Sequence, residues 1–465
     1  MSSIHETGMP FVVSTGVGKP DPNLRKFIRR HVMIGKNKGK VRPVRSKNGP
    51  DSSKSSPESQ ANSTDSLSTA SAPESIPSKV GSDLSTVQFA DSVDPSTVEI
   101  VLRFSSIAKQ ALYPLESCIS FDKRDSKMWL DPLSYDSAYL HAMIFTTHDY
   151  FDLLLNRVAS RKSLLHLGRA LELLRERLLR EDTGQAKIST LTASVVLALT
   201  GHALMKSEYA VAKHHMEGLH HIINLKGGIT LFRDSTKLLI EILRCDLWMT
   251  FQCGSSPLFS DSIQCYPLAR MSSPDQISFQ ALPNRLVHGS NEDLVMSWMA
   301  LDNFCHLVNS ACSSGTRIPK EVFADTMISV MYSLLDQRFE PGSMDELIRL
   351  GLLAFSSSVF IQWKFVKVRY AHFSHMYRDC LMAAQGVELA PQLSLWLLVV
   401  GSISVFDTED DGWLKPALRT TMQQCQIESW IDLRDVLQAF LWIGLCHDDL
   451  GSSLFGLLGL CIDGY

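Results

Sequence analysis

The feature that most restricts the fold of this chain is the spacing of its apolar residues, which recur at steps of three and four from about residue 95 onward. Residues 161–180 show it most clearly, with charged residues between the leucines Leu164, Leu167, Leu171, Leu174 and Leu178. Such a period places one apolar stripe and one charged face on an α-helix. Strand-like alternation of apolar and polar residues is almost absent. The sequence therefore predicts an all-α fold.

Further helices are predicted from the same pattern, at about 98–112, 134–156, 185–205, 208–225, 235–252, 291–312, 320–337, 343–381, 391–405, 413–425 and 430–446. The Ser- and Pro-rich stretch 254–288 predicts a long irregular loop between two helical halves. The apolar run 390–406 is at the lower length limit for a membrane span, and its polar residues favour a buried helix. We therefore expect one large all-α domain over 95–465, capped at its start by Asp94 or Ser96, and no membrane partner.

Positive charge is concentrated near the N-terminus. Residues 19–47 hold eleven Lys and Arg residues against the single acid Asp21, although the whole chain has a net charge of -4. Residues 51–90 contain 13 serines and hardly a large apolar side chain, so they cannot bury enough surface to offset the entropy of ordering. We expect a basic arm over 1–50 and a Ser-rich linker over 51–94, both disordered, in front of the helical domain.

The arm carries its charge in two clusters, as a bipartite nuclear import signal does, and these are Arg25, Lys26, Arg29, Arg30, Lys36, Lys38, Lys40, Arg42, Arg45 and Lys47. The same charges could hold nucleic-acid phosphates, with an affinity that falls steeply with salt. A short amphipathic helix over 23–34 could also bind a partner or a membrane surface. The charge pattern alone does not separate these interpretations, and we favour nuclear import among them.

The cysteines favour a reducing compartment. All ten are scattered singly with no Cys-x-x-Cys pair, and residues 1–13 lack the apolar core of a secretory signal. We expect reduced, mostly buried thiols in a nucleocytoplasmic protein.

Three stretches of the sequence carry more information than the helical pattern alone. The first comprises residues 212–228, ending in Lys226, Gly227 and Gly228, followed by Arg244, Asp246 and Pro257. The second holds Trp396, Gly401, Trp430 and Trp442, and the third is the arm over 11–40. Together they resemble the helical regulatory region of the fungal-specific transcription factor family, in a member that lacks the N-terminal binuclear zinc cluster.

The resemblance implies a transcriptional regulator in a fungal nucleus, acting through a helical regulatory and interaction domain. Its implied partners are DNA through the basic arm, proteins of the transcription machinery, and a second subunit in a homodimer or heterodimer. Two departures matter. Lys226 stands where the family has Arg, and the six closely spaced cysteines that hold the family's zinc pair are absent. Sequence-specific DNA reading is therefore not carried over.

Elementary chemistry assigns structural roles to the residues of the resemblance that lie in the predicted helical domain. Gly227 and Gly228 follow a predicted helix, and glycine supplies the left-handed conformation that satisfies the last carbonyls. Arg244 and Asp246 lie in the middle of an apolar helix, where an unpaired charge would be costly. We expect a buried or half-buried ion pair between them, serving as an internal staple rather than a ligand contact.

Chemical alternatives find less support. His214, Glu217 and His221 share one helical stripe and could converge on a metal, but all three come from one helix with no second supporting segment. The acidic clusters 407–411 and 448–449 lack the Asp-Asp-x-x-Asp motif of helical terpene cyclases. No catalytic elbow or phosphate-binding loop occurs. We expect no catalytic residue, cofactor or metal, with a non-DNA-binding scaffold or co-regulator as the second interpretation and a helical enzyme as the third.

Overall fold

The computed structural model describes residues 88–121, 129–155, 157–179, 189–263, 291–363, 368, 370–384, 389–407 and 410–458. Within these ranges the chain is helical almost throughout, and its strands are two segments of two residues each. The prediction of an all-α fold is confirmed. The predicted arm, with its ten candidate contact residues and its short helix, lies outside the described residues, as do residues 51–87 of the predicted linker.

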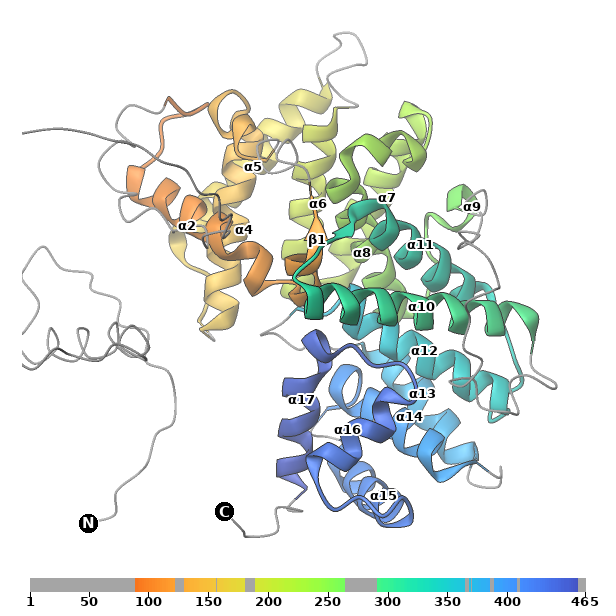
Figure 1. Ribbon diagram of the computed structural model, residues 1–465. Helices are drawn as coiled ribbons and strands as arrows, with labels where there is room; N and C mark the ends of the chain where they lie inside the picture. Colours follow the sequence, from red (N-terminus) through yellow and green to blue (C-terminus); the bar gives the residue numbers. More distant parts are fainter. Residues whose placement is uncertain are drawn as a thin grey trace, which may run out of the picture. The chain divides into compact units, whose positions relative to one another are not determined.

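The first half of the fold is built around two helices that each contact several others (Figure 1). Helix α4 packs against α2, α5 and α6, and α6 packs in turn against α7 and α8. The bounds are α2 Pro95–Ala111, α4 Ser137–Leu154, α5 Arg161–Leu179, α6 Thr190–Met205, α7 Tyr209–Lys226, α8 Thr236–Cys253 and α9 Ser260–Ile263. Three short 3-10 helices connect them, η2 Pro114–Cys118, η3 Asp131–Ser134 and η4 Ile229–Ser235.

The second half is centred on α14, which packs against α12, α15, α16 and α17. The bounds are α10 Glu292–Ser314, α11 Lys320–Asp336, α12 Met344–Phe360, α13 Ala371–Ala383, α14 Pro391–Ser404, α15 Asp411–Gln424, α16 Trp430–Gln438 and α17 Gly444–Leu457. Helix α8 joins the halves through contacts with α11 and α13, and strand β1 (Ile119–Ser120) pairs in parallel with β2 (Ile318–Pro319). One continuous apolar core runs through both halves.

Local signals place several helix ends as the sequence predicts. Helix α7 ends at Lys226, because Gly227 adopts a left-handed conformation with φ of 113°. The Gly227 and Gly228 N–H groups donate to the carbonyls of Asn224 and Ile223, which the helix leaves unsatisfied. At the start of α2, Asp94 accepts hydrogen bonds from the Ser96 N–H and hydroxyl groups.

Two predictions about helix bounds are wrong. The pattern over 343–381 forms two helices, α12 and α13, and the pattern over 430–446 is divided between α16 and α17. Apolar side chains are buried in both breaks, among them Ile361 and Tyr370 in the first and Leu441 and Ile443 in the second. The folded body also begins before residue 95, since the Ala90 N–H group donates to the Leu133 carbonyl at 3.0 Å.

The leucine stripe of α5 is only partly covered. Leu174 is buried and Leu167 half-buried, whereas Leu164 is 52% exposed and its neighbour Leu165 is 64% exposed. Helix α5 meets α4 through the small side chains of Ser163 and Ala170, which are fully buried and permit close approach. The helix is confirmed, but much of its apolar side faces outward.

The apolar run 390–406 forms the buried helix α14 that its polar residues favour. None of the helices described combines the length and apolar character needed to cross a membrane.

Candidate functional site

A cavity of about 330 Å³ lies among α2, α4, α6, α8 and η2. Its volume falls within the range of small-molecule binding sites. Most of its lining is aromatic or aliphatic, and the aromatic side chains include Phe104, Trp129, Tyr139, Tyr150, Trp248 and Trp363. Several lining side chains on α6 and α8 are half-buried rather than buried, so the cavity reaches the surface.

Gly201 gives the α6 wall of this cavity its space. It is a helical residue that lines the cavity, and a Cβ added there would meet no atom within 4 Å. Ala198 lies one turn earlier on the same wall. The small side chains on this face of α6 therefore leave open volume that larger residues would fill.

One wall of the cavity is charged, and Arg244 of α8 is its centre. Its side chain is only 2% exposed, and its Nη1 donates to Glu116 Oε1 at 2.9 Å and to Glu241 Oε1 at 2.7 Å. The guanidinium carbon lies 3.3 Å from the centroid of the Tyr113 ring, a cation–π contact. The Arg244 Nε donates to the Phe360 carbonyl at 2.7 Å, which anchors the group to the end of α12.

The remaining contacts of this wall extend the network outward. Lys237 Nζ donates to Glu116 Oε2 at 3.4 Å, and the Tyr113 hydroxyl donates to Glu241 Oε2 at 3.2 Å. Trp363 Nε1 donates in turn to the Tyr113 oxygen at 3.0 Å. We call Tyr113, Glu116, Lys237, Glu241 and Arg244 the charged wall.

Burial and neighbouring charges shift the pKa values of two residues of the charged wall in opposite directions. Burial alone would raise the pKa of Glu116, but the charges of Lys237 and Arg244 outweigh it and lower that pKa. Burial, reinforced by the Glu241 carboxylate, holds the pKa of Tyr113 well above its ordinary value. At neutral pH Glu116 is therefore ionised and Tyr113 is a neutral phenol.

The predicted ion pair between Arg244 and Asp246 is wrong, although both residues are buried. Residues two apart on a helix point in different directions, so each finds its own partners. Asp246, 1% exposed, accepts hydrogen bonds from the N–H groups of Leu258 and Phe259 at 2.8 and 3.3 Å and from the Tyr332 hydroxyl at 2.8 Å. Asp246 therefore holds the segment after α8 against α11, whereas Arg244 lies at the cavity.

The other residues of the resemblance are spread through the fold and do not converge on one site. Trp396 is fully buried and donates to the Leu441 carbonyl, and buried Trp442 donates to Asp448. Gly401 is packed closely against Phe406. The remaining three are half-buried, namely Lys226, whose Nζ lies 5.1 Å from the Phe232 ring centroid, Pro257 and Trp430. Their surroundings are those of packing residues.

His214, Glu217 and His221 lie on the exposed face of α7. Glu217 pairs with Lys213 at 4.0 Å, and His214 Nδ1 contacts the Ala210 carbonyl at 2.7 Å. In the described part of the chain, no three His, Cys, Asp or Glu side chains are grouped as metal ligands.

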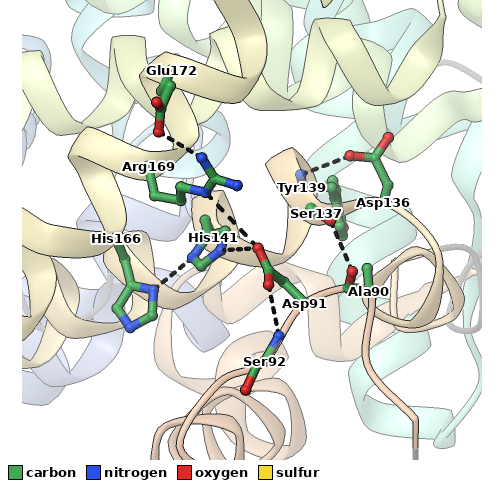
Figure 2. A network of polar contacts seen from close by, with 10 residues as sticks. All are labelled: Ala90, Asp91, Ser92, Asp136, Ser137, Tyr139, His141, His166, Arg169 and Glu172. Carbon is green, nitrogen blue, oxygen red and sulfur yellow. Dashed lines mark hydrogen bonds and ion pairs between the residues drawn. The ribbon is translucent and has the colours of Figure 1, made fainter. Parts of the chain in front are cut away.

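Sequence reasoning missed a histidine network between α4 and α5 (Figure 2). His141 Nδ1 lies 2.7 Å from His166 Nδ1, and His141 Nε2 lies 3.3 Å from Asp91 Oδ2. Burial lowers the pKa of His166 to about 4, and the His141 charge adds to that effect. Only one of the two facing nitrogens can carry the shared proton, and His166 stays neutral. Through the contact of His141 with Asp91, the network also fixes residues 90–92 on the helices.

A second missed cluster resembles a catalytic triad in composition but not in connectivity. His202 Nδ1 lies 2.5 Å from Asp149 Oδ2, and Ser163 Oγ donates to Asp149 Oδ1 at 2.9 Å. Both groups use the same carboxylate, so the histidine does not activate the serine as a base would in a triad. The arrangement fits a buried brace between α4, α5 and α6.

No protein-family model, curated protein or solved structure matches this chain.

Proposed function

We propose that this protein is a transcriptional regulator-like protein of a fungal nucleus whose helical body is a regulatory domain that binds a small, largely apolar molecule. The observation that carries the proposal is the cavity beside Arg244. An open, mostly apolar volume with a few convergent polar groups is the usual form of a ligand site. Larger side chains that filled this cavity would make the helical body more stable, so an open cavity without a ligand would only reduce its stability.

The nuclear part of the proposal is supported by sequence. The cationic segment 19–47 precedes a body of opposite net charge, an asymmetry suited to an import receptor or a nucleic acid. The family resemblance of residues 212–257 and 396–442 points the same way. DNA contact through the arm alone would be largely electrostatic, because no zinc-cluster cysteines are present to position a base-reading element.

The experiment is chromatin mapping of the tagged full-length protein in its native host. A matched variant carries Gln at the ten basic arm positions. The wild type should occupy discrete chromosomal sites, and the variant should lose both nuclear enrichment and occupancy. A wild type that is excluded from the nucleus or spread evenly over chromatin would overturn the proposal.

A second candidate function, a scaffold or co-regulator without DNA contact, is favoured by the exposed leucines of α5. Leu164, Leu165, Leu171 and Leu179 are each 42% to 68% exposed, enough apolar surface to form part of a partner interface. This candidate predicts discrete chromatin occupancy that survives loss of the arm charges, together with a partner that is lost when Leu165 and Leu179 become Lys.

A further inference from the structure

The cavity is elongated along two helices. Its lining extends on α6 from Thr190 to Met205 and on α8 from the N-cap residue Ser235 to Trp248. At a rise of about 1.5 Å per residue, these stretches span about 22 and 20 Å. A sphere of about 330 Å³ would be only about 9 Å across, less than half of that length. The cavity is therefore a narrow channel that fits a long molecule.

One end of the channel is aromatic. Ring contacts join Trp248 to Trp363 and Trp363 to Tyr150, with centroids 6.2 and 6.1 Å apart. Asp149, beside Tyr150 on α4, contacts His202 of α6 at 2.5 Å. The C-terminal ends of α6 and α8 therefore lie together at this aromatic end.

The opposite end, where α6 and α8 begin, is polar. Its lining residues include Thr190, Ser194, Ser235 and Lys237, all of them half-buried. Each carries a hydroxyl or ammonium group, so a polar head placed here would find hydrogen-bond partners. A ligand that matches both ends is an amphiphile with its tail toward Trp248.

Between the two ends lies the charged wall, whose groups satisfy one another. All four carboxylate oxygens of Glu116 and Glu241 accept a hydrogen bond from Arg244, Lys237 or Tyr113. The Tyr113 ring also lies against the Arg244 guanidinium. An apolar chain can therefore pass this wall without depriving either carboxylate of its partners.

The aromatic end favours a flexible tail over a flat ring system. The ring pairs Phe104 and Tyr150, Tyr150 and Trp363, and Trp363 and Trp248 are tilted by 52°, 63° and 81°. These pairs offer no parallel faces between which a flat ring system would stack. A chain, in contrast, bends to contact each ring in turn.

We infer that the cavity binds one extended alkyl chain of about sixteen carbons with a polar head, the head lying where α6 and α8 begin and the tail at the aromatic end. With bonds of about 1.52 Å and angles near about 111°, such a chain advances about 1.25 Å per carbon and spans about 20 Å. The inference rests on the proposed function, because both concern the same cavity. It adds the chemical class, length and orientation of the ligand.

A chain-length series tests the inference on the purified full-length protein. Isothermal titration calorimetry gives a Kd for straight-chain fatty acids of eight to twenty carbons, each kept below its critical micelle concentration. Each buried CH₂ group should lower the Kd about fourfold until about sixteen carbons, and the Kd should then level off. Pyrene-1-carboxylate, a flat ring system with the same head, should bind more weakly than hexadecanoate.

A matched pair of variants shows whether these chains occupy the cavity. Gly201 lies on the α6 wall about 16 Å from Thr190, and Gly168 is an exposed residue of α5 with equal space around its Cβ. Gly201→Phe should close the aromatic end and stop the gain in affinity at about twelve carbons. It should weaken hexadecanoate binding more than about tenfold and leave decanoate nearly unchanged, whereas Gly168→Phe should match wild type.

Brominated chains test the orientation, because bromine quenches tryptophan fluorescence on contact. 16-Bromohexadecanoate, with bromine on the last carbon, should quench the wild type more strongly than Trp248→Phe. 2-Bromohexadecanoate, with bromine beside the head, should quench both proteins equally. An effect of Trp248→Phe that is as large or larger for the 2-bromo acid overturns the inferred orientation.

The outcomes distinguish the inference from the proposed function. A Kd that levels near sixteen carbons in wild type and Gly168→Phe but near twelve in Gly201→Phe supports both. No binding of any probe, or a series unchanged by Gly201→Phe, overturns the proposed function itself. A wild-type Kd that levels by ten carbons, or tighter binding of pyrene-1-carboxylate than of hexadecanoate, overturns the inference alone where Gly201→Phe still weakens binding of a probe. The wild-type series tests the length even where circular dichroism shows that Gly201→Phe fails to fold.

Discussion

The buried carboxyl of Asp246 should make the stability of the protein depend on pH in an unusual direction. Burial raises its pKa from 3.8 to about 6, although hydrogen bonds from Leu258, Tyr332 and Phe259 oppose that rise. A raised pKa means that the folded state binds the proton more tightly than the unfolded state does. The stabilising contribution is therefore fully present below pH 3.8 and is lost as the pH rises through about 6.

The size of this effect follows from the two pKa values. Relative to low pH, this raised pKa destabilises the folded state by about 2 kcal/mol at pH 5 and by about 3 kcal/mol at pH 7. Asp246→Asn removes this titration, although its amide N–H group then faces the N–H donor of Leu258 or Phe259 and adds a cost independent of pH. The stability difference between wild type and variant should thus shrink by about 1 kcal/mol from pH 5 to pH 7.

Urea denaturation of both proteins at pH 5 and pH 7 measures that change in the free energy of unfolding. Subtracting the two proteins cancels the titration of every other group that they share. A difference that stays constant, or that grows with pH, would refute the assignment of a raised pKa to Asp246 and with it the interpretation of its buried site.

Three further predictions concern other parts of the fold. Burial lowers the pKa of His447 from 6.5 to about 3, so its contribution is lost as pH falls below 6.5; the free energy of unfolding should drop by about 2 kcal/mol more from pH 7 to pH 5 in wild type than in His447→Gln, measured by urea titration. Gly401→Ala should destabilise the protein by about 1–3 kcal/mol, because the new Cβ would clash with the Phe406 ring, whereas Gly412→Ala, with open space, should not. Cys118 and Cys312 have sulfurs 3.1 Å apart, and oxidised glutathione should join them with release of two reduced glutathione molecules; peptide mapping that finds no such disulfide contradicts this.

Helical class and most helix positions could be predicted from sequence because they depend on local signals. The apolar period predicted the positions of helices α4 to α8, and Gly227 ends α7 because it adopts the left-handed conformation. The breaks inside 343–381 and 430–446 carry no such signal at their first residues. Both breaks include buried apolar side chains, such as Ile361 in the first and Leu441 in the second, and the helical period does not distinguish these from residues of a continuous helix.

The candidate site was only partly accessible to sequence reasoning. The apolar helix around Arg244 indicated a buried charge in need of a partner, but its partners Glu116 and Glu241 come from η2 and from one turn earlier on α8. No spacing rule links Glu116 to Arg244, since they are 128 residues apart. The cavity is likewise a property of how α2, α4, α6 and α8 meet, and small residues such as Gly201 give no sign of it in sequence.

Transcript profiling in the native host tests most directly the claim that the helical body is a ligand-responsive regulatory domain. Four strains are compared at equal protein abundance: wild type, Gly201→Phe, Gly168→Phe, and a deletion of the gene. The transcripts altered by the deletion should also be altered in the Gly201→Phe strain, while Gly168→Phe should match wild type. A Gly201→Phe profile indistinguishable from wild type would contradict the claim.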